Sequence, residues 1–169
     1  MQERRKLHLL VISALFAAAI AVMTAYLLHI PIPTGGYIHV GDALIYLAAC
    51  LLPAPYAVGA AMVGAGLADL LTAPMWVVPT LVIKAAVALL FTSKPPQLLC
   101  PRNLAAAAGT CLLSPAGYGL AACLLTGSAN AFWPQFLGTL VQGVGSGVLF
   151  VVLALALDRS GLKARLSAV

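Results

Sequence analysis

A short polar stretch stands directly in front of an apolar run in this sequence. Residues 35–42 read Gly-Gly-Tyr-Ile-His-Val-Gly-Asp, and residues 43–52 are almost entirely apolar. The groups of Tyr37, His39 and Asp42 therefore lie at the edge of a hydrocarbon-like segment, where polar groups are costly and usually functional. We predict that they contact a ligand. Two simpler roles stay open, since Asp42 could cap the following helix and His39 could be an ordinary residue of the membrane interface.

Two charged residues fall inside apolar segments. Asp69 lies near the end of one segment, and Lys84 is the only basic residue deep within another. Because a short turn joins these segments, the two side chains could form an ion pair. Such a pair could simply neutralise itself, or one member could contact a polar ligand, and both possibilities fit the cost of charge in a membrane.

Other candidates open or interrupt the later segments. Trp76 and Thr80 begin one segment, and Asn130 stands just before the last one. Pro115 lies within Ser-Pro-Ala-Gly-Tyr-Gly, and because proline removes a helical hydrogen bond, we predict a kinked or unwound turn that presents Tyr118. The candidate ligand-binding set is Tyr37, His39, Asp42, Trp76, Thr80, Lys84, Tyr118, Asn130 and Gln135, with Thr139 and Gln142 deeper in the last segment. Since the inner halves carry almost nothing polar, we expect a pocket that opens outward and is closed inward, with Gly35, Gly36 and Gly41 as hinges of its rim.

The elements that position these residues are predicted to be membrane helices. The sequence is 63% hydrophobic and 8% charged, with a mean hydropathy of +1.06, whereas soluble domains carry about 25% charged residues. Prolines and polar residues divide it into six segments of about residues 7–29, 41–52, 56–72, 75–92, 104–126 and 132–157. Only helices or closed barrels satisfy their backbone in lipid. We therefore predict an all-α protein with six transmembrane helices, forming one integral membrane domain over residues 1–169.

The basic residues predict the orientation of these helices. Eight of the nine lie in residues 1–6, 93–103 and 158–169, all on one side if the segments alternate. The positive-inside rule then places both termini in the cytoplasm. A five-span alternative, with residues 41–52 re-entrant, would put the basic C-terminal residues outside. Since the charges flank apolar segments and form no aromatic-interleaved patch, we predict no nucleic-acid partner.

Small residues line one stripe of the first segment at helical spacing. They are Ala14, Ala17, Ala18 and Ala21. Such stripes allow close helix contact, either within the molecule or with a partner. Similar series in residues 60–68 and 143–147 are predicted to pack internally.

No catalytic or metal-binding pattern is present in the sequence. It has no phosphate-binding glycine loop, no His-Glu-x-x-His and no nucleophile elbow. The four cysteines lack metal-type spacing, so we interpret them as small packing residues. We predict a protein that is not an enzyme and needs no cofactor or metal.

The sequence resembles the substrate-binding S component of energy-coupling factor (ECF) vitamin transporters. The resemblance depends on the six predicted helices, on the alanine-rich first segment and on residues 36–49, 64–71 and 79–84. The resemblance implies capture of a micronutrient from outside a bacterial or archaeal cell, with residues 30–40 as a lid. It also implies a transmembrane coupling subunit that docks on the first-helix alanines, and two separate ATPase subunits. Metal-transporting members begin with a Met-His chelate, which Met1-Gln2 does not match.

The resemblance leaves the substrate open, although the aromatic and amide candidates favour a flat heterocycle such as a vitamin, a vitamin precursor or a queuosine-type base. One rival interpretation is a self-sufficient ion-coupled secondary transporter or small channel. Another is a structural membrane protein without a ligand.

Overall fold

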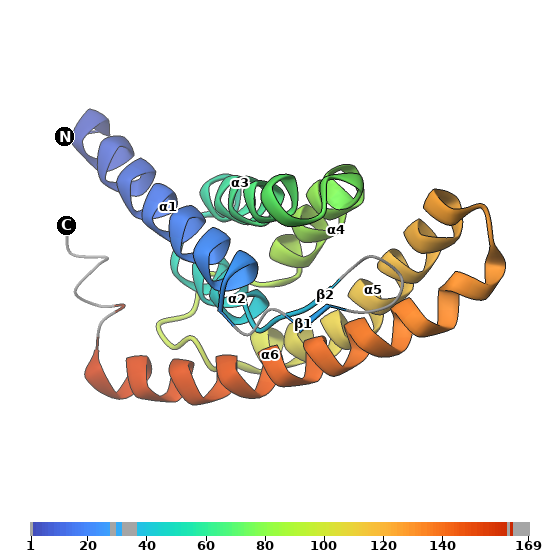
Figure 1. The fold of residues 1–169 in the computed structure, drawn as a ribbon. Coiled ribbons are helices and arrows are strands. Elements are labelled where there is room, and N and C mark those ends of the chain that lie inside the picture. Colours follow the sequence, from blue (N-terminus) through green and yellow to red (C-terminus); the bar gives the residue numbers. More distant parts are fainter. Residues whose placement is uncertain (1, 28–29, 32–36, 162, 164–169) are drawn as a thin grey trace.

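Six α-helices account for most of the described chain, and a short β-hairpin joins the first two (Figure 1). The computed structural model describes residues 2–27, 30–31, 37–161 and 163. The helices are α1 (Gln2–Ala25), α2 (Asp42–Leu51), α3 (Ala54–Thr72), α4 (Val77–Leu90), α5 (Pro101–Thr126) and α6 (Phe132–Ser160), with 3₁₀ turns η1 (Pro74–Trp76) and η2 (Ala129–Ala131) before α4 and α6. Strands β1 (Ile30–Pro31) and β2 (Tyr37–Ile38) pair antiparallel. The predicted all-helical architecture is confirmed.

Four of these helices are long and apolar enough to cross a bilayer. They cover residues 3–25, 54–72, 101–126 and 129–160, whereas the helical segments 42–51 and 74–90 are shorter. The 10 residues of α2 span about 15 Å, about half of a hydrocarbon core. Length and composition thus support four crossings directly. Six crossings and two cytoplasmic termini stay predictions, although the beginning of α1 and the end of α6 lie at the same end of the bundle in Figure 1.

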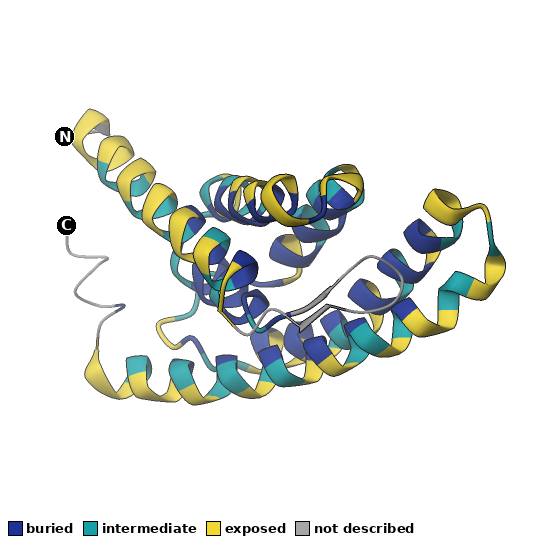
Figure 2. Cartoon of the chain, viewed as in Figure 1, coloured by how far each residue is buried: buried dark blue, intermediate teal, exposed yellow. Residues whose placement is uncertain are grey.

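The short helix α2 forms the centre of the molecule. It contacts α1, α3, α4 and α6, and every residue of it except Leu44 and Leu51 is buried. The outer faces of the surrounding helices are exposed, as Figure 2 shows along α1 and α6, and they carry many large apolar side chains. A helix enclosed by protein on all sides does not need to span the bilayer, which explains how so short a segment is accommodated.

Glycines lie at two of the predicted helix contacts, and the one on α3 leaves no room for a side chain. A Cβ added to Gly64 on α3 would lie 2.6 Å from the carbonyl oxygen of Ala17 and 2.8 Å from Cβ of Ile20 on α1. A Cβ on Gly143 of α6 would lie 3.5 Å from Cα of Cys111 on α5. The α3 and α6 series therefore pack internally at these positions, although Gly147 has no neighbour within 4 Å.

The helix α5 is continuous through its internal proline. It runs unbroken from Pro101 to Thr126 with Pro115 inside it, so the predicted unwound turn is wrong. Pro115 is fully buried, and α5 packs along α6. Neighbouring helices can hold the backbone of a membrane helix where proline removes one hydrogen bond.

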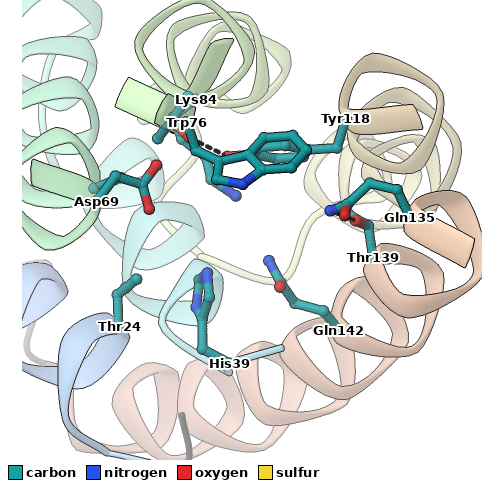
Figure 3. A pocket seen from close by; sticks show the side chains of 11 residues that line it. Thr24, His39, Asp69, Trp76, Lys84, Tyr118, Gln135, Thr139 and Gln142 are labelled. Atoms are coloured by element: carbon teal, nitrogen blue, oxygen red, sulfur yellow. Dashed lines mark hydrogen bonds between the residues drawn. The ribbon is translucent and has the colours of Figure 1, made fainter. Parts of the chain in front are cut away.

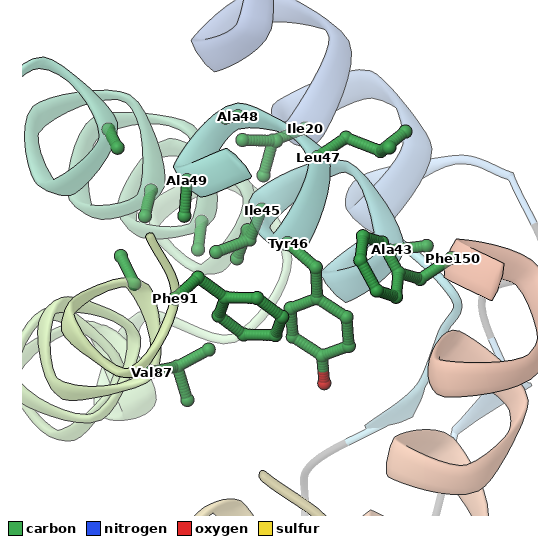
Figure 4. Close-up of a cluster of buried hydrophobic side chains, with 14 of the residues drawn as sticks. Ile20, Ala43, Ile45, Tyr46, Leu47, Ala48, Ala49, Val87, Phe91 and Phe150 are labelled. Atoms are coloured by element: carbon green, nitrogen blue, oxygen red, sulfur yellow. The ribbon is translucent and has the colours of Figure 1, made fainter. Parts of the chain in front are cut away.

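Three aromatic rings fill the centre of the bundle (Figure 4). Tyr46 stacks on Phe91 with ring centroids 4.8 Å apart, and Phe150 meets the two rings edge-on at 5.8 and 5.7 Å. All three are buried. They come from α2, from the residue that follows α4 and from α6. Along these helices they lie one or two turns from the polar residues described in the next section, and they fill the interior there with apolar side chains.

Candidate functional site

A polar cavity lies among the helices and is lined by side chains from all parts of the chain (Figure 3). Its lining consists of Thr24, His39, Ala65, Asp69, Trp76, Thr80, Lys84, Tyr118, Gln135, Thr139 and Gln142. Six of the nine predicted ligand-binding residues are in this set, so the structure brings together most of what the sequence proposed.

One wall of the cavity is aromatic. The rings of Trp76 and Tyr118 are 5.8 Å apart and tilted by 53°, and both side chains are buried. The hydroxyls of Tyr118 and Thr80 share a hydrogen bond of 2.7 Å. Because η1 and α4 place Trp76 and Thr80 one turn apart on the same side, the phenol is fixed against the indole.

The floor of the cavity is a buried ion pair between α4 and α2. Lys84 donates to both carboxylate oxygens of Asp42, at 2.7 and 2.8 Å, and each side chain is 1% exposed. Gln142 of α6 donates to the same carboxylate at 3.0 Å, and the Lys84 ammonium lies 5.1 Å from the centre of the Tyr118 ring. A buried pair is tolerated only when such additional bonds satisfy it.

This pair corrects two predictions. The ion partner of Lys84 is Asp42 rather than Asp69, because α2 occupies the centre of the bundle between α4 and α6. Asp42 is also not a helix cap: Gly41 holds the cap position without a side-chain bond. The carboxylate of Asp42 lies behind Lys84 and Gln142 and is not part of the cavity lining.

Asp69 and His39 line the cavity on the side of α1 and α3 (Figure 3). Each is 5% exposed. The backbone N–H of Gly41 donates to Nδ1 of His39 at 3.0 Å, so the proton of a neutral imidazole is on Nε2. The segment before α2 thereby presents one ring nitrogen as a donor.

Gly41 is needed for a reason other than the predicted hinge. Its backbone angles, φ −60° and ψ −22°, are those of an ordinary helical residue. A Cβ at this position would overlap the hydroxyl of Thr24 and lie 3.1 Å from Nδ1 of His39. Close approach to α1, rather than backbone freedom, therefore requires glycine. Gly35 and Gly36 lie outside the described residues.

The third wall of the cavity comes from α6. Gln135, Thr139 and Gln142 recur at helical spacing, and Gln135 donates to the hydroxyl of Thr139 at 3.3 Å. The polar series continues beyond the cavity, since Ser146 lies one turn further along α6 and Ser114 one turn from Tyr118 on α5, both 1% exposed or less. The interior is therefore more polar than predicted. The sequence did carry a signal for these two serines, because Ser146 follows Gln142 by four residues and Ser114 precedes Tyr118 by four, so each lies on the same helix face as its neighbour.

Three other candidates are not brought into the cavity by the described structure. Asn130 is exposed in η2, where its N–H donates to the side chain of Ser128. Trp133, suggested as a stacking residue, is 63% exposed and packs on Phe132 and Phe136. The side chain of Tyr37 lies outside the described part.

The predicted lid is described only at its two ends. Strands β1 and β2 pair there, and β2 contacts α6. The lining residues that sequence reasoning missed are Thr24 and Ala65. Thr24 was recognisable as a polar residue in an apolar segment, whereas an alanine carries no such signal.

The four alanines of α1 do not share one environment. Ala14 and Ala18 are exposed and Ala21 is half-buried, whereas Ala17 is 7% exposed and lies against Gly64 of α3. Only Ala14 and Ala18 are fully open to a partner. Among the described residues, no group of three or more His, Cys, Asp or Glu side chains is placed to hold a metal ion.

The sequence matches the family model for the ECF-type riboflavin transporter, S component, over residues 4–159, which is most of the chain. No curated protein and no solved structure gives a significant match. The matched region runs from the start of α1 almost to the end of α6, so it includes every residue that lines the cavity.

Proposed function

Because the chain belongs to the family of S components of ECF-type riboflavin transporters, we propose that it captures a small micronutrient outside the cell for ATP-driven uptake. The observation that carries the proposal is the polar cavity with an aromatic wall inside an apolar bundle. Polar groups in a membrane interior are costly and are usually retained for function. A cavity lined by such groups is what a binding subunit needs.

The lining supports a flat heterocyclic ligand. Trp76 and Tyr118 offer ring faces for stacking, and aromatic pairs of this kind favour planar partners. Gln135 and Gln142 supply amides from the other side of the cavity (Figure 3). An aromatic vitamin, a vitamin precursor or a queuosine-type base would use both surfaces at once.

The charged side chains of the lining add polar contacts for a ligand. The ammonium of Lys84 is shared with Asp42, while Asp69 adds a carboxylate and His39 an imidazole to the lining. Groups of either charge thus border the cavity, so charge alone does not select an acidic or a basic ligand.

Transport requires partners that the chain itself does not provide. We place a transmembrane coupling subunit on the open face of α1, where Ala14 and Ala18 are exposed, since small residues let helices approach closely. Two ATPase subunits would supply the energy, and the protein would be a multi-pass component of a bacterial or archaeal cell membrane.

The proposal is tested by identifying and titrating the ligand. The protein is purified alone, and any bound molecule is identified by mass spectrometry. Riboflavin, the thiamine pyrimidine, pyridoxine and the queuosine base are then titrated by tryptophan fluorescence. The chain has two tryptophans, one in the cavity and one 63% exposed, so W133F isolates the signal of Trp76.

In W133F we expect ligand-dependent quenching to persist with unchanged affinity. In W76F the quenching should disappear, and in W76A, which removes the ring, affinity measured by calorimetry should fall about 2- to 10-fold, the value of one aromatic contact. A protein that binds none of the panel, but moves solute in proteoliposomes without ATPases, would instead establish the ion-coupled transporter.

A further inference from the structure

A second cavity lies at the other end of α4 from Trp76. It lies between the turn that joins α2 to α3 and residues 91–100, which join α4 to α5. Its lining includes apolar side chains such as Leu52 and Leu89 and the cationic side chains of Lys94 and Arg102. Ala88, also in this lining, lies about 12 Å along α4 from Thr80, so the two cavities serve different ends of the bundle.

The two cations at this cavity are not neutralised by described acids. Lys94 and Arg102 are exposed, and neither forms an ion pair with an acid among the described residues. The carboxylate of Asp158 accepts from the backbone N–H groups of residues 98 and 99, at 2.8 and 3.0 Å. The cavity therefore carries two positive charges.

The cations are held on a rigid frame. Asn103 is fully buried; it accepts from the N–H of Thr92 at 2.9 Å and donates to the carbonyls of Thr92 and Leu98 at 3.0 and 2.9 Å. Lys163 donates to the carbonyl of Pro95 at 2.6 Å. Since these bonds fix residues 92–98 against α5, the cationic rim needs little ordering when a ligand binds.

The opposite wall is apolar and open. Leu89 lies on the last turn of α4 and is 58% exposed. A cavity that sets an exposed apolar side chain opposite two cations matches the two parts of a phospholipid, its acyl chains and its charged headgroup. Basic pockets between membrane helices are suited to anionic headgroups, and arginine binds phosphate through two parallel hydrogen bonds.

We propose that this cavity is a binding site for an anionic phospholipid. The phosphate lies between Lys94 and Arg102, the glycerol lies near Thr92 and Ser93, and an acyl chain runs along Leu89. A soluble phosphate would use the cations but not the apolar wall, which is why a lipid is favoured.

The test measures lipid retention by the full-length protein with native mass spectrometry in detergent. Phosphatidylglycerol and phosphatidylcholine are added in equal amounts, and K94Q/R102Q is compared with R4Q/R5Q, which removes the same charge from the exposed start of α1. Each cation near a membrane surface contributes enough that losing two should weaken phosphatidylglycerol binding about 30-fold. R4Q/R5Q should change it less than about 3-fold, and phosphatidylcholine should be unaffected by both.

Equal losses in both variants would show only general charge attraction and would overturn the site. Competition with glycerol phosphate distinguishes a lipid headgroup from a soluble phosphate. If glycerol phosphate binds as tightly as the lipid, the apolar wall contributes nothing to binding and the lipid assignment fails. The same conclusion follows if L89S keeps full lipid binding. Unchanged lipid binding with loss of coupling-subunit capture would assign the cavity to a protein partner instead. If the double variant does not fold, K94Q alone serves, because the side chain of Lys94 is exposed.

Discussion

The buried ion pair between Asp42 and Lys84 should make the fold highly sensitive to the loss of either member alone. Both side chains are 1% exposed, and the carboxylate also accepts from Gln142. The variants D42N and K84M each leave one charge buried without its partner. The double variant D42N/K84M leaves none, and it keeps the approximate volume of both side chains.

The expected magnitudes follow from this geometry. Removing one member of a buried pair costs about 3–5 kcal/mol, whereas replacing both members by neutral groups is often close to neutral. We therefore expect each single variant to lose about 3 kcal/mol or more of unfolding free energy and the double variant to lose less than about 2 kcal/mol. The departure from additivity should therefore be about 4 kcal/mol or more, which is above the usual range of about 0.5–3 kcal/mol for residues in contact.

Equilibrium unfolding in mixed micelles of mild detergent and SDS, followed by circular dichroism, measures these values. The matched control is the exposed pair Glu3–Lys6, with N–O distance 2.9 Å and side chains 87% and 60% exposed, whose double replacement should change little. If D42N and K84M each cost less than about 1 kcal/mol, or if their costs add in the double variant, the pair does not support the fold as argued.

Three further predictions concern packing and docking. G64A should lower the free energy of unfolding by about 1–3 kcal/mol, because its Cβ would lie 2.6 Å from a backbone oxygen of α1. The control G59A lies in the same helix, where an added Cβ would meet nothing within 4 Å, and it should be neutral or stabilising. Equal effects of the two variants would exclude close packing as the cause. N103A should lower the free energy of unfolding by about 1–3 kcal/mol, since the backbone N–H of residue 92 loses its acceptor. Proteolysis at residues 92–98 should also become faster. The control N130A, at an exposed site, should leave the unfolding free energy and the proteolysis rate unchanged. A18L should keep ligand affinity and stability but reduce capture of the coupling subunit, and normal capture would remove the docking face from α1.

Much of the fold was predictable because its signals are local. Apolar runs broken by proline and glycine gave all six helical segments, and α3, α4 and α5 begin within a few residues of the predicted positions. Small-residue spacing indicated the contact at Gly64 for the same reason. Hydropathy and helical periodicity belong to each segment by itself, so no knowledge of the other segments was needed.

The partners of the polar residues were less predictable. Proximity along the chain suggested Asp69 as the partner of Lys84, but the short helix α2 lies at the centre of the bundle and brings Asp42 to it instead. In the same way, Asn130 and Gln135 are neighbours in sequence, yet one is exposed in a turn and the other lines the cavity.

The sequence by itself thus determined that the protein is a helical membrane protein with polar groups concentrated in a few segments, and it indicated most of the residues that meet in the cavity. Only the tertiary structure decided which of those groups neutralise one another, which face the cavity and which alanines of α1 stay open. The physical reason is that the cost of burying a polar group is a property of the residue, whereas its compensation depends on the helix faces that packing places opposite it.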